Sequence, residues 1–211
     1  MTEESSEITE ILHRATSGDQ DALNELFTRY RDRLKRMIRL RLNRRLIGRL
    51  DDSDILQDAL LHASKHLHEY LQNPSMSFFL WLRHIVELKL LSVHRQHLGI
   101  EKRDANREIS LHRGGYPAAS SASLAAQLMG HLTSPSQAAV KAEMRIQLQE
   151  ALNGMDPIDR EVLTLRHFEQ LTNAETAQVL EIQETAASKR YVRALDRLQN
   201  ILSELNIFHE E

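Results

Sequence analysis

The chain has 211 residues, a formal net charge of −3 and no cysteine. This length fits one or two domains, and 41% hydrophobic with 27% charged residues excludes collagen-like and wholly disordered chains. The lack of cysteine excludes disulfides, a thiolate nucleophile and zinc bound by sulfur, and it fits a reducing compartment. No apolar stretch approaches the roughly 20 residues that span a bilayer, and the polar start does not resemble a secretory signal. We therefore expect a cytoplasmic protein without a membrane partner.

The composition favours helices throughout. Leu occurs 33 times and Val six times, and branching at Cβ suits a strand better than a helix. Apolar residues at spacings of three and four predict a first helix that begins near Gln20, with Asp19 as its N-cap. Further helices are expected over about 52–71 and 77–98, separated by a polar loop at 72–75.

From residue 99 to 136 the composition shifts to glycine, proline, serine and alanine, with a short helix expected near 124–129. A long stretch with so little periodicity joins domains more often than it lies inside one. We therefore predict an all-α protein of two small helical domains, 1–98 and 137–211, joined by a flexible linker.

The second domain carries the clearest local signals. Asp156 and Pro157 form a cap followed by proline at the first helical position, and Thr172 with Glu175 fits a capping box. A short helix, a tight turn and a long helix over about 184–205 then predict a helix-turn-helix motif.

Charge is segregated along the chain, so the net value is a poor guide to partners. Residues 31–50 hold nine basic side chains and one acidic one, a local balance of +8. The eight residues that follow contain Asp51, Asp52, Asp54 and Asp58 and no base. Opposed patches of this kind can serve different partners.

The long C-terminal helix has an apolar face and a cationic one. Lys189, Arg193 and Arg197 recur at intervals of four, with Arg190 beside them. A packed face opposite a cationic face is how a recognition helix enters the major groove of DNA. A solvated basic surface is the alternative, and the capping box and tight turn before this helix favour DNA.

Residues 171–198 resemble the helix-turn-helix of bacterial RNA polymerase sigma factors, especially the extracytoplasmic-function (ECF) class. The matching positions are Leu171, Thr172, Glu175, Ala177, Leu180, Ile182, Arg190, Arg193, Ala194 and Leu198. Two segments of the first domain, 54–60 (DILQDAL) and 78–86 (FFLWLRHIV), are similar to the other sigma domain. The three matches occur in the family's order around a linker. Glu181 replaces the usual turn glycine, so the turn either avoids a positive φ or accepts strain.

The resemblance implies a non-enzymatic adaptor, without cofactor or metal, that binds core RNA polymerase and places it on a promoter. It assigns polymerase binding to Asp54, Ile55, Gln57 and Asp58. It assigns the minus-ten element to Asn73, Ser75, Phe78, Trp81, Arg83, His84 and Lys89. Contacts to the minus-thirty-five element fall to Thr185, Ser188, Lys189, Arg190, Arg193 and Arg197.

Within these sets the roles differ. Arg190 is the first candidate for a guanine because only arginine offers a planar fork to its two acceptors, whereas Arg193 and Arg197 suit phosphates. Core packing is the alternative for Phe78 and Trp81. The basic stretch before residue 50 fits either duplex DNA or polymerase.

Two other functions stay open at this point. A helix-turn-helix regulator could bind operator DNA without polymerase, as a dimer on two half-sites. A metal-dependent hydrolase is the other alternative, because His62 and His66 lie four residues apart on an expected helix. No HExxH pattern accompanies them. The sequence also leaves open an anti-sigma partner, the activating signal and the promoter sequence.

Overall fold

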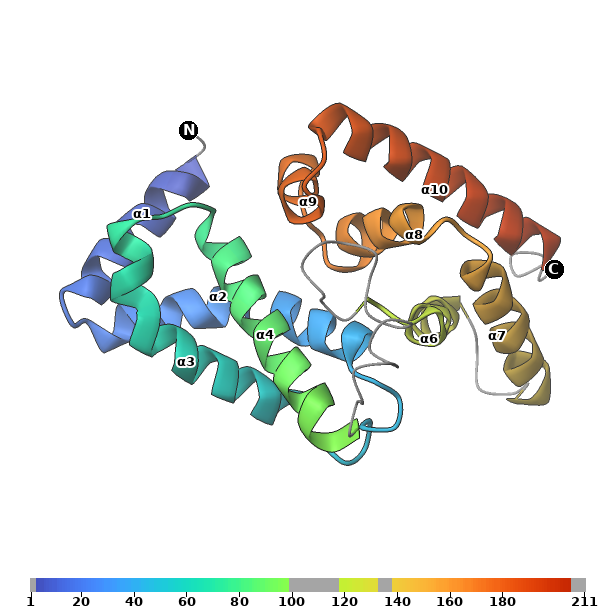
Figure 1. Cartoon of the computed structure of the whole chain (residues 1–211), viewed down its shortest axis with the longest axis horizontal. Helices are drawn as coiled ribbons and strands as arrows, with labels where there is room; N and C mark the ends of the chain where they lie inside the picture. Colours follow the sequence, from blue (N-terminus) through green and yellow to red (C-terminus); the bar gives the residue numbers. More distant parts are fainter. Residues whose placement is uncertain (1–2, 99–117, 133–137, 206–211) are drawn as a thin grey trace.

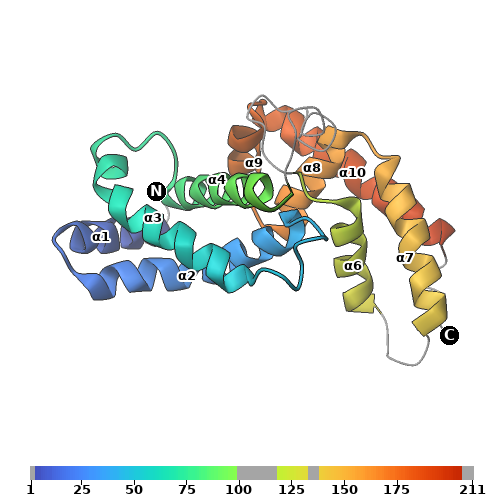
Figure 2. The same cartoon turned by 60° about the horizontal axis from the view of Figure 1, so that its bottom comes forward.

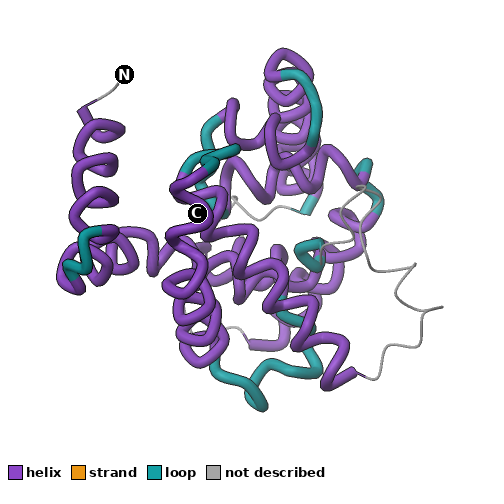
Figure 3. Tube along the Cα trace, turned by 60° about the vertical axis from the view of Figure 1, so that its left-hand side comes forward, coloured by secondary structure: helices purple, strands orange, loops and turns teal. Residues whose placement is uncertain are grey.

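The computed structural model describes residues 3–98, 118–132 and 138–205. Within these ranges the regular structure is helical, apart from an isolated bridge between Ile47 and Leu50 (Figure 3). The predicted all-α fold class is confirmed. The first lobe contains α1 (Glu3–Thr16), α2 (Gln20–Arg41), α3 (Asp52–Gln72) and α4 (Phe78–Leu98). The rest contains α6 (Ser121–Leu132), α7 (Ala138–Asn153), α8 (Pro157–Leu163), the π-helical turn η1 (Thr164–Phe168), α9 (Asn173–Leu180) and α10 (Glu184–Glu204) (Figure 1).

Local capping chemistry fixes where the helices of the first lobe begin. The Asp19 carboxylate accepts hydrogen bonds from the backbone N–H groups of Asp21 and Ala22, which satisfies two free donors at the start of α2. Asp51 does the same for Ser53 at the start of α3, at 2.7 Å. The three long helices α2, α3 and α4 then pack together around an apolar core.

An aromatic cluster closes the end of this lobe where α3 meets α4. Tyr70 stacks on Trp81 with ring centroids 4.7 Å apart, and its hydroxyl donates to the Met76 carbonyl at 2.9 Å. Phe78 is buried between Tyr30 and Tyr70. The loop over 73–77 is therefore anchored by the aromatic rings beneath it.

The second lobe contains a helix-turn-helix, formed by α9 and α10, which packs against α8. Asp156 caps α8, and the capping box of Thr172 and Glu175 is present at the start of α9. Glu181 ends α9 in the left-handed region, with φ +53° and ψ +40°. Helix α10 follows and packs along α8. The predicted tight turn is thus built with a positive φ at a glutamate, which accepts strain of order 1 kcal/mol.

The predicted linker is described only in part, because 99–117 and 133–137 lie outside the described residues. Between them α6 packs against α7 and against α2, with Leu124 and Ala125 fully buried. The core of the first lobe also continues into the second through Val162, Leu165 and Leu171. The two lobes therefore lie in direct contact (Figure 2).

Candidate nucleic-acid interface

Helix α10 presents one exposed face along the outside of the second lobe. Ala187, Ala194 and Leu198 are buried against the lobe, and the opposite side of the helix is open. The predicted minus-thirty-five residues that are exposed on this helix are Thr185, Ser188, Lys189, Arg193 and Arg197. The geometry of a free helix side above a packed one meets the requirement for insertion into a major groove.

Arg190 and Arg193 differ from the other predicted residues because the buried carboxylate of Asp159 binds both of them. Its Nη1 donates to Asp159 Oδ1 at 2.7 Å, and Arg193 binds the same carboxylate through Nε at 2.6 Å and Nη2 at 2.8 Å. Burial raises the pKa of Asp159, but the hydrogen bonds from Arg193 and Arg190 outweigh it and the net pKa is lowered. Asp159 is therefore ionised and fixes both guanidinium groups against α8. This role could not be predicted from the sequence, because Asp159 and Arg190 are 31 residues apart.

The predicted minus-ten residues do not form one surface. Asn73 and Ser75 are exposed in the loop between α3 and α4, and Trp81 and His84 are half-buried on α4. Lys89 lies farther along α4 and pairs with Asp58 on α3 at 2.7 Å. Phe78 is 3% exposed, which agrees with the packing alternative for that ring.

Arg83, also predicted to contact the minus-ten element, is buried in a charge network between the lobes. Its Nε donates to Glu169 Oε2 at 2.9 Å, and Arg41 Nε donates to Glu169 Oε1 at 2.7 Å. Arg41 also binds Glu161, and Arg83 binds Glu87. The side chains of Arg41, Arg83 and Glu169 are each 2% exposed. Arg83 is thus not available to DNA in this arrangement of the lobes.

All members of this network that carry a resolved pKa shift keep their charge. Burial raises the pKa of Glu169, yet the charges of Arg41 and Arg83 outweigh it and the net pKa is lowered. Burial lowers the pKa of Arg41, but Glu161 and Glu169 reverse this and raise it. The interface between α2, α4, α8 and the end of η1 is therefore a buried ionic junction, which we call the charge junction (Arg41, Arg83, Glu87, Glu161 and Glu169).

Further polar contacts join the lobes through Arg33 and Gln178. Arg33 Nη2 donates to the Gln170 carbonyl at 2.9 Å, and its guanidinium stacks over the Phe79 ring at 3.6 Å. Gln178 on α9 donates to the carbonyl of Ser75 at 3.5 Å. The helix-turn-helix therefore touches the same loop that was predicted to hold the minus-ten bases.

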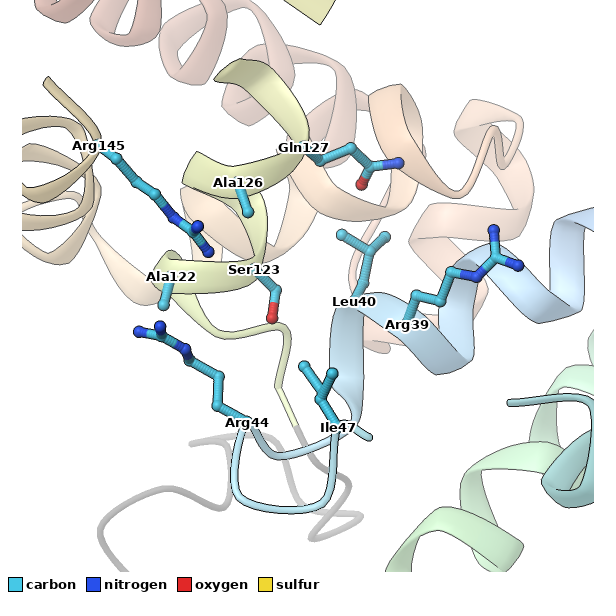
Figure 4. A pocket seen from close by; sticks show the side chains of 9 residues that line it. All are labelled: Arg39, Leu40, Arg44, Ile47, Ala122, Ser123, Ala126, Gln127 and Arg145. Atoms are coloured by element: carbon cyan, nitrogen blue, oxygen red, sulfur yellow. The ribbon is translucent and has the colours of Figure 1, made fainter. Parts of the chain in front are cut away.

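The basic residues of α2 and the following loop differ in exposure and in their partners. Lys35 and Arg39 pair with Asp52, while Arg44, Arg45 and Arg49 are exposed in the loop before α3. A hollow of about 290 Å³ opens beside this loop. It is lined by Arg39, Leu40, Arg44, Ile47, Ala122, Ser123, Ala126, Gln127 and Arg145, with Arg44 and Arg145 extending toward it from opposite sides (Figure 4).

The predicted polymerase-binding residues separate into exposed and buried members. Asp54, Gln57 and Asp58 are exposed on α3, whereas Ile55 is 4% exposed and belongs to the core. Leu61, one turn beyond, is 56% exposed and was missed by the sequence analysis. The face therefore combines carboxylates with an exposed apolar side chain.

The histidine pair and the membrane question can also be addressed for the described residues. The rings of His62 and His66 lie 4.1 Å apart, and His66 Nδ1 contacts the His62 carbonyl. Across 3–98, 118–132 and 138–205, no group of three or more His, Asp or Glu side chains is placed to hold a metal ion. In the same ranges no helix has the length and apolarity to cross a membrane.

Comparison with known proteins gives one family. The family model described as ECF sigma factor matches residues 5–204. The fold is similar to CnrH, solved in complex with the cytosolic domain of CnrY, with 21% identity, a TM-score of 0.53 and coverage of 92% of this chain and 96% of that one. A second similar structure is the sigma factor RpoE in complex with the anti-sigma factor NepR from Bartonella quintana, with 18% identity, a TM-score of 0.48 and coverage of 87% and 98%. No protein with a curated description matches the chain.

Proposed function

The chain belongs to the ECF sigma factor family and acts in transcription initiation, and on this premise we propose how its surfaces divide the work. The protein is a non-enzymatic, cytoplasmic adaptor, in which α3 binds core RNA polymerase and the other candidate surfaces bind promoter DNA. The observation that carries this proposal is the family match itself, because it spans both the α3–α4 lobe and the helix-turn-helix lobe.

The exposed face of α3 suits a partner whose surface is basic and can also cover the exposed apolar side chain of this face. Asp54 and Asp58 are four residues apart on one side of the helix, and Leu61 lies about 20° from Asp54 and about 60° from Asp58 around the helix axis. The carboxylates steer a basic surface into place, and burial of Leu61 contributes affinity. Lys89 competes for Asp58 in the free protein.

Promoter DNA contacts both lobes in this proposal. Helix α10 enters the major groove of the minus-thirty-five element, and the loop with Asn73 and Ser75 meets unpaired bases of the minus-ten element beside Trp81. Unpaired bases need stacking surfaces, and the partly exposed Trp81 ring can supply one.

The two promoter sites cannot be occupied together in the arrangement described above. Elements named for positions −10 and −35 are 25 base pairs apart, which is about 85 Å of duplex at about 3.4 Å per base pair. Here the helix-turn-helix touches the minus-ten loop directly, through Gln178 and Ser75. We infer that this is a closed arrangement and that the lobes separate on the promoter.

An anti-sigma factor fits the same picture as a partner that keeps the lobes closed. The similar protein CnrH was solved in a complex with another protein, the cytosolic domain of CnrY. For the present chain the proposed inhibitor would bind both lobes and keep the charge junction intact.

The test is reconstitution with core RNA polymerase that lacks any sigma factor. We expect a stable complex and transcripts with defined start sites from genomic DNA, and we expect Asp54→Lys to weaken the complex about tenfold or more. Glu150→Lys, at an exposed position on α7, is the matched control for the change of charge. The alternative, a regulator that binds operators alone, predicts tight sequence-specific binding by the free protein and no transcript that depends on it.

A further inference from the structure

An exposed valine lies in the middle of the free face of α10. Val192 is 55% exposed, although large apolar side chains on this helix are otherwise directed toward the core, as Leu198, Ile201 and Leu202 are. At about 100° per residue, Thr185, Ser188 and Lys189 lie within about 60° of Val192 around the helix axis. The buried Ala194 and Ile201 lie on the opposite side.

By the same helical geometry, Arg190 and Arg193 lie away from the centre of this face. Arg190 points about 160° from Val192 and Arg193 about 100° from it. Both are held by Asp159 on α8. Side chains at the flank of a groove-bound helix meet the phosphates that border the groove, and those contacts position the protein without reading sequence.

We propose that Val192 is a specificity-determining residue that reads the methyl group of a thymine in the minus-thirty-five element. The proposal rests on the proposed function above and refines it. Valine has no hydrogen-bonding group on its side chain, and the apolar feature that a base pair presents in the major groove is the thymine C5-methyl. Thr185, Ser188 and Lys189 supply hydrogen bonds to neighbouring base edges, Arg193 lies at the flank toward the backbone, and Arg190 stays on the packed side of the helix with Asp159.

Isolated exposed apolar residues are common on protein surfaces, and Val192 differs from them by its neighbours. Ile146 on α7 is exposed to a similar degree, 58%, but sits on a different helix, outside the α10 face. It therefore provides a matched control of the same chemistry in the same chain.

The experiment first removes the methyl group from the DNA and only then changes the protein. Holoenzyme reconstituted with core polymerase selects preferred promoters from a library randomised at the minus-thirty-five element. Each thymine of the selected element is then replaced, one at a time, by deoxyuridine. At one position we expect the affinity of wild-type holoenzyme to fall about fourfold, the value of one buried methyl group.

Val192→Ala should bind the thymine and deoxyuridine promoters equally at that position, and Ile146→Ala should keep the wild-type difference. Val192→Thr, which retains one methyl group, should keep part of it. The proposal is overturned if no position responds to deoxyuridine, or if Val192→Ala still discriminates. If the proposed function is wrong, the result is distinguishable: no complex with core polymerase forms and no promoter sequence is selected. That result also overturns the proposal for Val192. Thermal melts of each variant check that the fold is intact.

Discussion

Replacing Glu169 by glutamine tests whether the charge junction holds the lobes together. Glu169 bridges two buried guanidinium groups, from Arg41 at 2.7 Å and Arg83 at 2.9 Å. A neutral amide can accept from one of them, but its NH₂ group then faces the other donor. Removing one partner of a buried hydrogen-bonded charge pair costs about 2–5 kcal/mol. Glu161 and Glu87 still neutralise the arginines, so we expect the lower end of this range.

A cost of about 2 kcal/mol changes the ratio of closed to open molecules by about 30-fold. The cost falls on the closed state, because separation of the lobes returns the same groups to water. Each lobe keeps its own helix packing, so the variant should remain helical. A buried charge network orients two surfaces without binding them tightly, since desolvation offsets most of the attraction. The closed state is therefore sensitive to this single change.

The assay uses the absence of cysteine from the chain. Glu69→Cys on α3 and Asn200→Cys on α10, both exposed, accept a dye pair for single-molecule energy transfer. Glu169→Gln should shift molecules from a high-transfer to a low-transfer population, whereas Glu150→Gln should leave the distribution unchanged. An unchanged distribution in Glu169→Gln would refute the role of the charge junction. Because the pKa of Glu169 is lowered in the closed state, the closed population should also decline as the pH falls below the ordinary carboxyl pKa of 4.5.

Three further predictions concern single residues. Glu181→Gly should raise the free energy of unfolding by about 0.5–1 kcal/mol, because it removes the strain of a positive φ; urea denaturation with an unchanged m-value measures it, and a loss of stability would contradict the reasoning. His94 accepts the Asn43 N–H at 3.1 Å and burial lowers its pKa below 6.5, so stability should be full above pH 6.5 and decline below it. His94→Gln should flatten that decline, as followed by thermal melts at each pH. Arg197→Ala should weaken holoenzyme binding to all promoter sequences alike and lower the slope of log affinity against log salt by about one; a change in sequence preference would assign Arg197 to bases instead.

The sequence predicted well those features that depend on neighbours along the chain. The caps at Asp19, Asp156 and Thr172 and the helices they begin follow from the chemistry of three or four consecutive residues. The positive φ at Glu181 was one of two alternatives, and the structure selects it.

Features that join distant residues were beyond the sequence. Arg83 was assigned to DNA from its place in a family segment, but its partner Glu169 is 86 residues away. A buried arginine cannot be told from an exposed one by helical spacing alone when another lobe covers it. Val192 is a different case. The helical spacing of the sequence places it beside Thr185, Ser188 and Lys189, but the residues assigned to DNA from the sequence were all polar or basic.

In the proposed function, the closed contact between Gln178 and Ser75 couples the two ligands of the protein, polymerase and promoter DNA, provided that each of them binds the open lobes. Polymerase that binds the open lobes removes the free-energy cost of opening, and promoter DNA then binds without meeting that cost again. The coupling free energy is equal in both directions, so DNA that holds the lobes apart also raises the affinity for polymerase. Its size is set by the closing constant, so a variant that weakens the charge junction should bind each ligand better alone and gain less from the other.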